Sequence, residues 1–356
     1  MKNHSVRISA IATANPPLYV TQEEAYTYYN SMFDLSDNEM ALYRKLLLDS
    51  AIDGRYVGMD TPAEIKETDP DELNRRFLKH GRKTGAKAVN LALKQSGLKP
   101  EDIGGIVVNS CTGYLCPGLS SYIFEDIGFP SNVQFVDLMG IGCGGALPNL
   151  SVAAGMLAGK LRKPVISLSV EICTATLFMG NDPGLIVSNS IFGDGASAAI
   201  LVSDTEEVNE SQGVALVDYE SGLFPRYRSD LQYRMEDHRL RNVLSTRVPT
   251  IGAKTILEVA TRLLDRNKLT KDQIKYWAVH SGGTAVLEGI GHAFGLKNNE
   301  LCYSYEVFKK YGNMSSPSVM FVLQNILEHG KPEKGQYGLL LAFGAGFSAF
   351  AILLRF

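Results

Sequence analysis

One pattern of helix and strand occurs twice in this chain, and that repeat limits the folds it can adopt. Residues 85–110 (GAKAVNLALKQSGLKPEDIGGIVVNS) and 252–281 (GAKTILEVATRLLDRNKLTKDQIKYWAVHS) each predict an amphipathic helix, a polar turn and an apolar strand. A second helix and a second strand follow each copy, at 143–170 and at 313–343. We therefore expect an α/β fold built from two similar halves, the alternative being chance similarity between two helix–strand units.

The repeat brings distant side chains to equivalent positions. Cys143 precedes the strand at Val165 by 22 residues, and Asn313 precedes the strand at Tyr337 by 24, so both occupy a loop-to-helix junction. His280 ends the strand that matches the one ending near Asn109. Sites in α/β sheets form beyond the carboxyl ends of strands. If the halves pack about a pseudo-twofold axis, these junctions converge.

Cys143 lies among glycines in the stretch MGIGCGGALPNL, residues 139–150, just before a predicted helix. Glycine permits close approach of the backbone to a ligand or to another segment. Unpaired N–H groups and the positive end of the helix dipole favour a thiolate, so Cys143 is a candidate nucleophile. The alternative is a buried structural cysteine in a tight turn.

Charge and cysteine usage exclude several classes of function. The net charge is −3 and no basic block is present, which argues against a nucleic-acid partner or an anionic membrane surface. Five scattered cysteines and no convincing signal peptide predict reduced thiols in a cytoplasmic protein. Cys111 and Cys116 have four residues between them but no second pair follows, which argues against a zinc site.

The apolar segment 337–356 (YGLLLAFGAGFSAFAILLRF) has the length of a membrane span. Its central GAG fits two buried strands joined by a tight turn, and we favour that interpretation over an integral membrane segment.

A cysteine with a distant histidine and asparagine is a nucleophile set. Around Cys143, His280 and Asn313 the chain resembles the type III polyketide synthases, the chalcone synthase family of the thiolase-like fold. The matching pieces run in the family's order over nearly the full chain: ATANPP near the start, the cysteine turn, IFGDGASAAIL at 191–201, HSGGTAVL at 280–287, YGNMSSPSVMFVL at 311–323 and AFGAG at 342–346.

The resemblance implies a five-layered αβαβα fold with two pseudo-symmetric halves. Residues 1–215 would carry the nucleophile, and residues 216–356 would carry the histidine and the asparagine. It also implies a homodimer that uses acyl-CoA and malonyl-CoA without a metal, a redox cofactor or a separate carrier protein.

The resemblance also assigns roles at the reacting centre. Cys143 would take an acyl group from an acyl-CoA as a thioester, with an imidazolium partner and the helix end keeping it ionised. Decarboxylation of malonyl-CoA would give an enolate that attacks this thioester, with His280 and Asn313 as hydrogen-bond donors to the enolate oxygen. Phe192 matches the family's gatekeeping phenylalanine, and its ring would disfavour the malonyl carboxylate and favour its loss as carbon dioxide.

Five further residues are expected to bind substrate. Cys111, Cys116 and Ser315 match cavity positions, and Cys116 falls where the family often has a methionine that reaches the partner subunit's site. Lys45 and Arg55 are candidate contacts for the CoA phosphates.

Two departures from the family bear on the product. The late turn reads AFGAG where plant members have GFGPG, and Asn242 falls nearest to a second gatekeeper that is usually phenylalanine. Small pocket residues without that second ring predict an aliphatic starter, iterative extension and cyclisation to an alkylpyrone or alkylresorcinol. The alternatives are a single-condensation β-ketoacyl synthase III-like enzyme and a catalytically silent protein that binds CoA esters.

Overall fold

The computed structural model describes residues 6–159, 161–203 and 213–356, so the polar segment 204–212 lies outside the described residues. Within these described residues, nine strands form one mixed sheet in the order β11-β12-β13-β8-β1-β7-β6-β4-β5. Their bounds are β1 Val6–Ala14, β4 Gly105–Asn109, β5 Gln134–Leu138, β6 Val165–Ile172, β7 Asp194–Ser203, β8 Val214–Leu223, β11 Ile274–Val279, β12 Tyr337–Gly344 and β13 Ser348–Arg355. Two small antiparallel pairs lie apart from this sheet: β2 (Leu18–Thr21) with β3 (Gly54–Val57), and β9 (Leu231–Glu236) with β10 (Arg239–Leu244).

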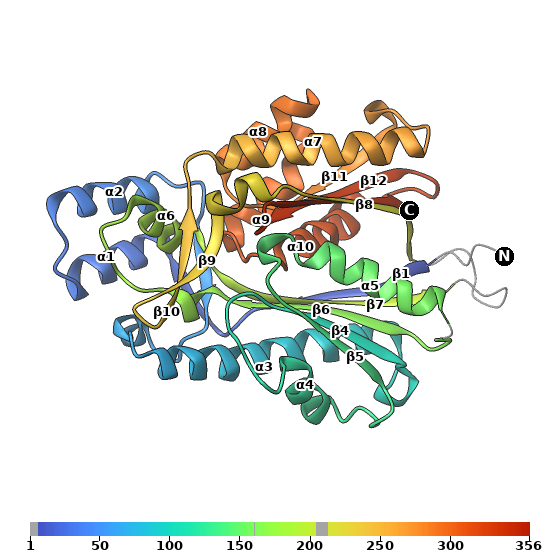
Figure 1. Ribbon diagram of the computed structural model, residues 1–356, viewed down its shortest axis with the longest axis horizontal. Helices are drawn as coiled ribbons and strands as arrows, with labels where there is room; N and C mark the ends of the chain where they lie inside the picture. The colour runs from blue at the N-terminus through green and yellow to red at the C-terminus, as the bar shows by residue number, and fades with distance from the viewer. Residues whose placement is uncertain (1–5, 160, 204–212) are drawn as a thin grey trace.

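The helices divide into those that cover the sheet and those beside it. The α-helices are α1 Gln22–Met32, α2 Asp37–Leu48, α3 Pro70–Ser96, α4 Leu119–Ile127, α5 Ala146–Ala158, α6 Pro183–Ile191, α7 Val248–Arg266, α8 Thr284–Phe294, α9 Cys302–Tyr311 and α10 Ser318–Asn325. Helices α1, α2 and α6 form a separate group at one end of the molecule (Figure 1).

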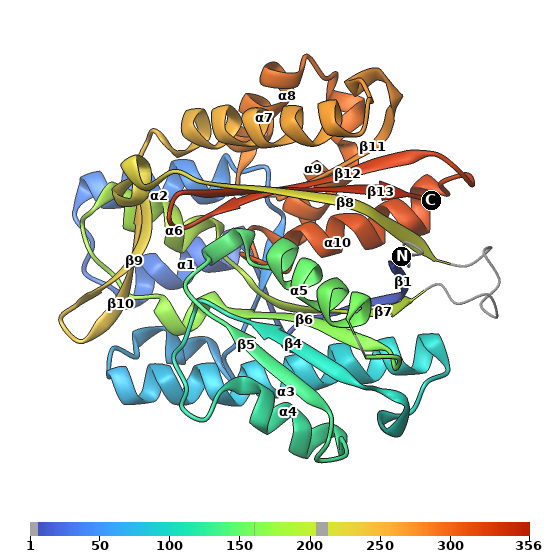
Figure 2. The ribbon, with the colours of Figure 1, turned by 45° about the vertical axis from the view of Figure 1, so that its right-hand side comes forward.

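The sheet folds back on itself, which produces the five expected layers. Among the described residues, its two parts pair only through the short β1–β8 ladder from Val6↔Leu216 to Ile8↔Val214. Helices α5 and α10 lie between the two parts, α7 and α8 cover one outer face, and α3 and α4 cover the other (Figure 2). The predicted αβαβα architecture is therefore confirmed.

Strand pairing reveals the same repeat that the sequence contains. The order β1-β7-β6-β4 in one part matches β8-β13-β12-β11 in the other, and only β5 lacks a counterpart among the described strands. In both parts the strand that follows the long outer helix, α3 or α7, pairs in parallel with the next strand of the repeat: β4 with β6, and β11 with β12. The predicted boundary between residues 215 and 216 falls within β8 and stays a prediction.

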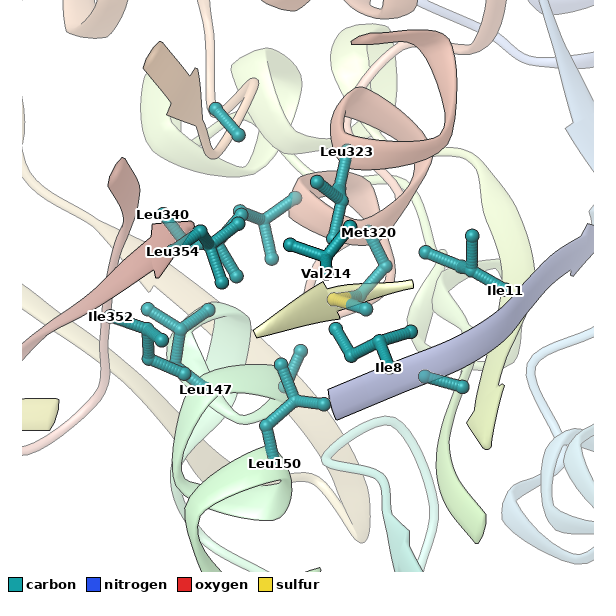
Figure 3. Close-up of a cluster of buried hydrophobic side chains, with 14 of the residues drawn as sticks. Ile8, Ile11, Leu147, Leu150, Val214, Met320, Leu323, Leu340, Ile352 and Leu354 are labelled. Atoms are coloured by element: carbon teal, nitrogen blue, oxygen red, sulfur yellow. The ribbon is translucent and has the colours of Figure 1, made fainter. Parts of the chain in front are cut away.

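Buried apolar side chains join the layers. The central cluster combines Leu147 and Leu150 of α5, Met320 and Leu323 of α10, and side chains from both parts of the sheet such as Ile8 (Figure 3). Because burial of such side chains contributes about 1.5–3 kcal/mol each, this shared core fixes one half against the other.

The apolar segment at the end of the chain forms β12 and β13, which pair along their whole length and are buried on both faces. In the part of the chain that the structure describes, no helix is long and apolar enough to cross a membrane. The prediction of two buried strands joined by a tight turn is confirmed.

Candidate active site

Cys143 occupies a glycine turn, Gly142–Gly144, that leads into helix α5 as predicted. Gly142 has φ +68°, and a Cβ there would lie 2.9 Å from the backbone nitrogen of Ala345. A Cβ on Gly344 would lie only 2.1 Å from the carbonyl oxygen of Ile141. The cysteine turn and the β12–β13 turn therefore pack backbone against backbone, which requires glycine at both places.

His280 and Asn313 come from the other half of the repeat. His280 directly follows β11, and its backbone N–H donates to the carbonyl of Leu341 at 2.8 Å. Its ring is 1% exposed, and Nδ1 has no hydrogen-bond partner among the described residues. Asn313 follows α9 after Gly312, and its Nδ2 donates to the carbonyl of Gly282 at 3.2 Å.

Cys143, His280, Asn313 and Phe192 line one cavity of about 570 Å³. Exposed Lys45 also lines it and lies close in the chain to Asp49, another lining residue. The remaining walls are largely apolar: Leu46, Ala51, Pro183, Val187, Ile191, Leu231, Leu244, Val248, Pro249, Val286, Phe308 and Phe343. The cavity therefore collects the predicted reacting groups from both halves.

The segments that carry Phe192 and Asn313 are joined through their backbones. The N–H of Asn313 donates to the carbonyl of Ile191 at 2.8 Å, and the N–H of Gly193 donates to the carbonyl of Asn313 at 2.9 Å. These bonds form an isolated parallel bridge between residues 192 and 313. The gatekeeper position and the amide position cannot move independently.

Burial opposes charge on both the thiol and the imidazole. It raises the pKa of Cys143 to about 12, although a hydrogen bond from Ser315 Oγ to Sγ at 3.4 Å acts in the opposite direction. Burial also lowers the pKa of His280 to about 4. Each group taken alone is therefore neutral at pH 7, and the helix end does not by itself produce the expected resting thiolate.

A carboxyl group that the sequence analysis missed lies behind Cys143. Glu171 of β6 is fully buried and accepts hydrogen bonds from Cys111 N at 3.0 Å, Thr112 Oγ1 at 2.9 Å and Ser316 Oγ at 2.7 Å. Burial raises its pKa despite these bonds. The sequence signal for this buried carboxyl is the acidic residue that ends the apolar run PVISLSVE. A carboxylate in such a run is expected to be buried and therefore to need several hydrogen-bond partners.

Cys111 and Ser315 belong to this carboxyl network and are not among the residues that line the cavity. Cys111 Sγ lies 3.3 Å from Glu171 Oε1 and 3.6 Å from Ser315 Oγ, which in turn reaches Cys143. Burial raises the pKa of Cys111 well above its ordinary value, and the neighbouring carboxylate acts in the same direction. Their contact with substrate stays a prediction.

The prediction that Arg55 contacts CoA phosphates is wrong. Arg55 is 4% exposed and is absent from the cavity lining, and its guanidinium is bonded to Gln22 Oε1 and to the carbonyls of Asn189 and Phe192. A guanidinium already bonded to buried acceptors cannot also bind a phosphate at the surface.

The other two pocket positions differ from each other. Cys116 is exposed and does not line the cavity of its own chain, so its predicted contact with substrate depends on a partner subunit. Asn242 of β10 is buried and lines a gap of about 10 Å³ on the Phe192 side of the site, together with Thr176. The hydroxyl of Tyr233, which the sequence analysis did not single out, lies 3.4 Å from Thr176 Oγ1 and 3.5 Å from Asn242 Nδ2.

Comparison with known families agrees with this geometry. The family described as FAE1/Type III polyketide synthase-like protein matches residues 12–276, and the C-terminal domain of chalcone and stilbene synthases matches residues 216–356. The chain belongs to the type III polyketide synthases. It is thus a condensing acyltransferase of the kind that extends a starter iteratively into a polyketide.

Named relatives cover nearly the whole chain. A 3,5-dihydroxyphenylacetyl-CoA synthase of Streptomyces toyocaensis is 28% identical and covers 96% of this chain and 87% of its own length. A 1,3,6,8-tetrahydroxynaphthalene synthase of Streptomyces peucetius subsp. caesius is 28% identical, with 98% and 92% covered. The crystal structure of PKS-I from the brown alga Ectocarpus siliculosus superposes with a TM-score of 0.92 at 26% identity and covers 100% of this chain and 99% of that chain.

Proposed function

We propose that this type III polyketide synthase loads an aliphatic acyl-CoA onto Cys143 and extends it with malonyl-CoA to an alkylpyrone or alkylresorcinol. The convergence of Cys143, His280, Asn313 and Phe192 on one apolar cavity carries this proposal.

Loading begins with transfer of the thiol proton of Cys143 to the imidazole of His280. Burial disfavours each charge alone, but the thiolate and the imidazolium form together and offset part of each other's desolvation. Sγ then attacks the acyl-CoA carbonyl, the bond from that carbon to the CoA sulfur breaks, and CoA leaves with the proton. Nδ1 of His280 has no hydrogen-bond partner among the described residues, so no neighbour fixes the tautomer of the ring that takes and returns the proton.

Extension uses malonyl-CoA without any further reagent. Its carboxylate leaves as carbon dioxide, and the electron pair of the broken C–C bond becomes the enolate of acetyl-CoA. The Asn313 amide and the His280 imidazole donate hydrogen bonds to that enolate oxygen, while the Phe192 ring makes the region unfavourable for the carboxylate. The enolate carbon bonds to the thioester carbonyl and releases the Cys143 thiolate, so the β-ketoacyl product leaves on CoA.

These steps support a reaction without a metal or redox cofactor, because none of them needs an oxidant or a reductant other than the substrates. The substrates are acyl-CoA and malonyl-CoA, and the ammonium of Lys45, the one cationic side chain among the described lining residues, would contact the CoA phosphates. The five free thiols support a reducing compartment, the cytoplasm, as the place of work.

The apolar lining supports an aliphatic starter. Leu231, Leu244 and Val248 contribute aliphatic side chains to the cavity, and Asn242 stands where a second phenylalanine gate is usual. The two Streptomyces relatives are named for aromatic products, so a comparison of straight-chain with aromatic starters tests the proposed product.

We also propose a homodimer. Strand β5 ends the sheet, and Phe135 on it is 62% exposed. Met139 just after this strand and Tyr114 in the β4–α4 connection are also exposed. Exposed strand edges and large apolar side chains of this kind are covered in stable proteins, and a second copy would cover them. A monomer by light scattering at micromolar concentration would refute the dimer.

The decisive experiment incubates the protein with straight-chain and aromatic acyl-CoA starters plus malonyl-CoA and identifies the products by mass. We expect cyclised products with several added two-carbon units from straight-chain starters and none from Cys143→Ala. A single added unit would indicate a β-ketoacyl synthase III-like enzyme. Absence of carbon dioxide release from malonyl-CoA would indicate a silent CoA-ester-binding protein.

A further inference from the structure

Helix α6 ends at the gatekeeper, and distant groups satisfy its last carbonyls. Tyr29 Oη donates to the carbonyl of Asn189 at 3.0 Å, and Gln22 Nε2 donates to that of Ser190 at 3.0 Å. The carbonyl of Ile191 accepts from Asn313 N. Helix C-termini leave such carbonyls without partners inside the helix, so these bonds determine where α6 stops.

Arg55 donates to two carbonyls at this helix end, and one of them, that of Phe192, lies just beyond the last helical residue. Its Nη1 donates to the carbonyl of Asn189 at 2.7 Å and to that of Phe192 at 2.8 Å. Its Nε donates to Gln22 Oε1 at 2.9 Å, which fixes the plane of the guanidinium. A cation at a helix C-terminus also interacts favourably with the helix dipole. Arg55 is therefore a C-terminal cap supplied by strand β3.

The aliphatic part of Arg55 packs against both catalytic segments. A Cβ built on Gly193 would lie 3.3 Å from Arg55 Cβ, and one built on Gly312 would lie 3.0 Å from Arg55 Cγ. Gly193 follows Phe192, and Gly312 precedes Asn313. The side chain of Arg55 thus passes beside the backbone bridge between residues 192 and 313.

We propose that Arg55 is a positioning residue that holds the Phe192 ring and the Asn313 amide in place for decarboxylation. It acts through the carbonyls of Asn189 and Phe192 and does not contact substrate. The proposal rests on the proposed function, in which these two side chains act on malonyl-CoA. Cys143 lies on a different turn, Gly142–Gly144, and none of the three Arg55 bonds reaches it, so we expect acyl loading to change little when Arg55 is replaced.

Arg55→Met keeps the aliphatic packing and removes all three hydrogen bonds. Arg55→Lys keeps the charge but cannot reproduce the flat fork of donors. A misplacement of about 1 Å at a reacting group costs on the order of 100-fold in rate. We expect both variants to release carbon dioxide from malonyl-CoA about 100-fold more slowly, with acyl loading of Cys143 unchanged within about twofold.

Tyr29→Phe is the matched control. Tyr29 is 2% exposed and donates to the same Asn189 carbonyl, but no bond joins its hydroxyl to Phe192. Its loss should lower the melting temperature without changing the ratio of decarboxylation to loading. Added guanidinium ion at low concentration should restore part of the decarboxylation rate of Arg55→Ala and none of that of Asn313→Ala.

The outcomes separate the two proposals. If wild-type protein releases no carbon dioxide and loads no acyl group, the proposed function fails. If wild type does both and the Arg55 variants keep the wild-type ratio of decarboxylation to loading, the role of Arg55 is overturned while the function stands. Should Arg55→Met fail to fold, the same ratio measured for Arg55→Lys decides.

Discussion

An alanine at Gly344 tests whether the turn after β12 determines the position of Cys143. The added Cβ would lie 2.1 Å from the carbonyl oxygen of Ile141 and 2.7 Å from the nitrogen of Gly144. Both contacts are with backbone atoms of the cysteine turn, so no side chain can rotate away. The two turns must separate by at least about 0.9 Å to reach the shortest separation that real Cβ atoms show.

Separation of the two turns should lower both the stability of the protein and the rate of acyl loading. Overpacking of a close contact costs about 1–3 kcal/mol in the free energy of unfolding. Displacement of the nucleophile by about 1 Å lowers its reaction rate on the order of 100-fold. We expect Gly344→Ala to load Cys143 from a straight-chain acyl-CoA about 100-fold more slowly, measured as the mass of the intact protein against time.

Gly155→Ala is the control, because Gly155 lies in the helix that follows Cys143 and a Cβ there meets no atom within 4 Å apart from the backbone of its own helix. It should raise the free energy of unfolding by about 0.5–1 kcal/mol and leave loading unchanged. Wild-type loading in Gly344→Ala would refute the claim that backbone packing between the two turns positions the thiol.

Three further perturbations test the site and its surroundings. Asn313→Ala should lower decarboxylation of malonyl-CoA by about 100- to 1,000-fold with loading retained, and loss of loading alone would contradict its role as a donor. Ser315→Ala removes the hydrogen bond that lowers the pKa of Cys143, so the pH midpoint for alkylation by iodoacetamide should rise, and a lower midpoint would contradict this. Burial raises the pKa of Asp194 to about 6 from an ordinary 3.8, so the folded state binds the proton more tightly and wild type should lose about 3 kcal/mol of stability as pH rises from about 4 to 6. Denaturant titrations of Asp194→Asn across this pH range should show no such fall in the free energy of unfolding. An equal dependence of that free energy on pH in the two proteins would contradict the assignment.

The repeat, the junction of Cys143 and the terminal strands could be predicted because each depends on local pattern. Helical and strand periodicities identify the units, and glycine marks turns where backbones approach closely. The convergence of His280 and Asn313 on Cys143 followed once the halves were matched. These features need only sequence order and the geometry of an α/β sheet.

Glu171 and Arg55 could not be placed in this way, because their roles depend on partners far away in the sequence. The carboxyl of Glu171 is bonded to the segments 110–112 and 315–316. The guanidinium of Arg55 was predicted to bind phosphate from its position in the family pattern, yet it caps a helix more than 130 residues away. Burial also determines the protonation of Cys143, and burial is a property of the whole fold.

The repeated strand order explains how two equivalent junctions can carry different reacting groups. Two identical copies of one half, associated about a twofold axis, would present the same residue at both junctions. A single chain that contains both halves places a thiol at one junction and a carboxamide at the other. In the proposed mechanism, the covalent attachment point and the hydrogen-bond donor can therefore be altered one at a time, and substitutions that suit a new starter need not disturb decarboxylation of the extender unit.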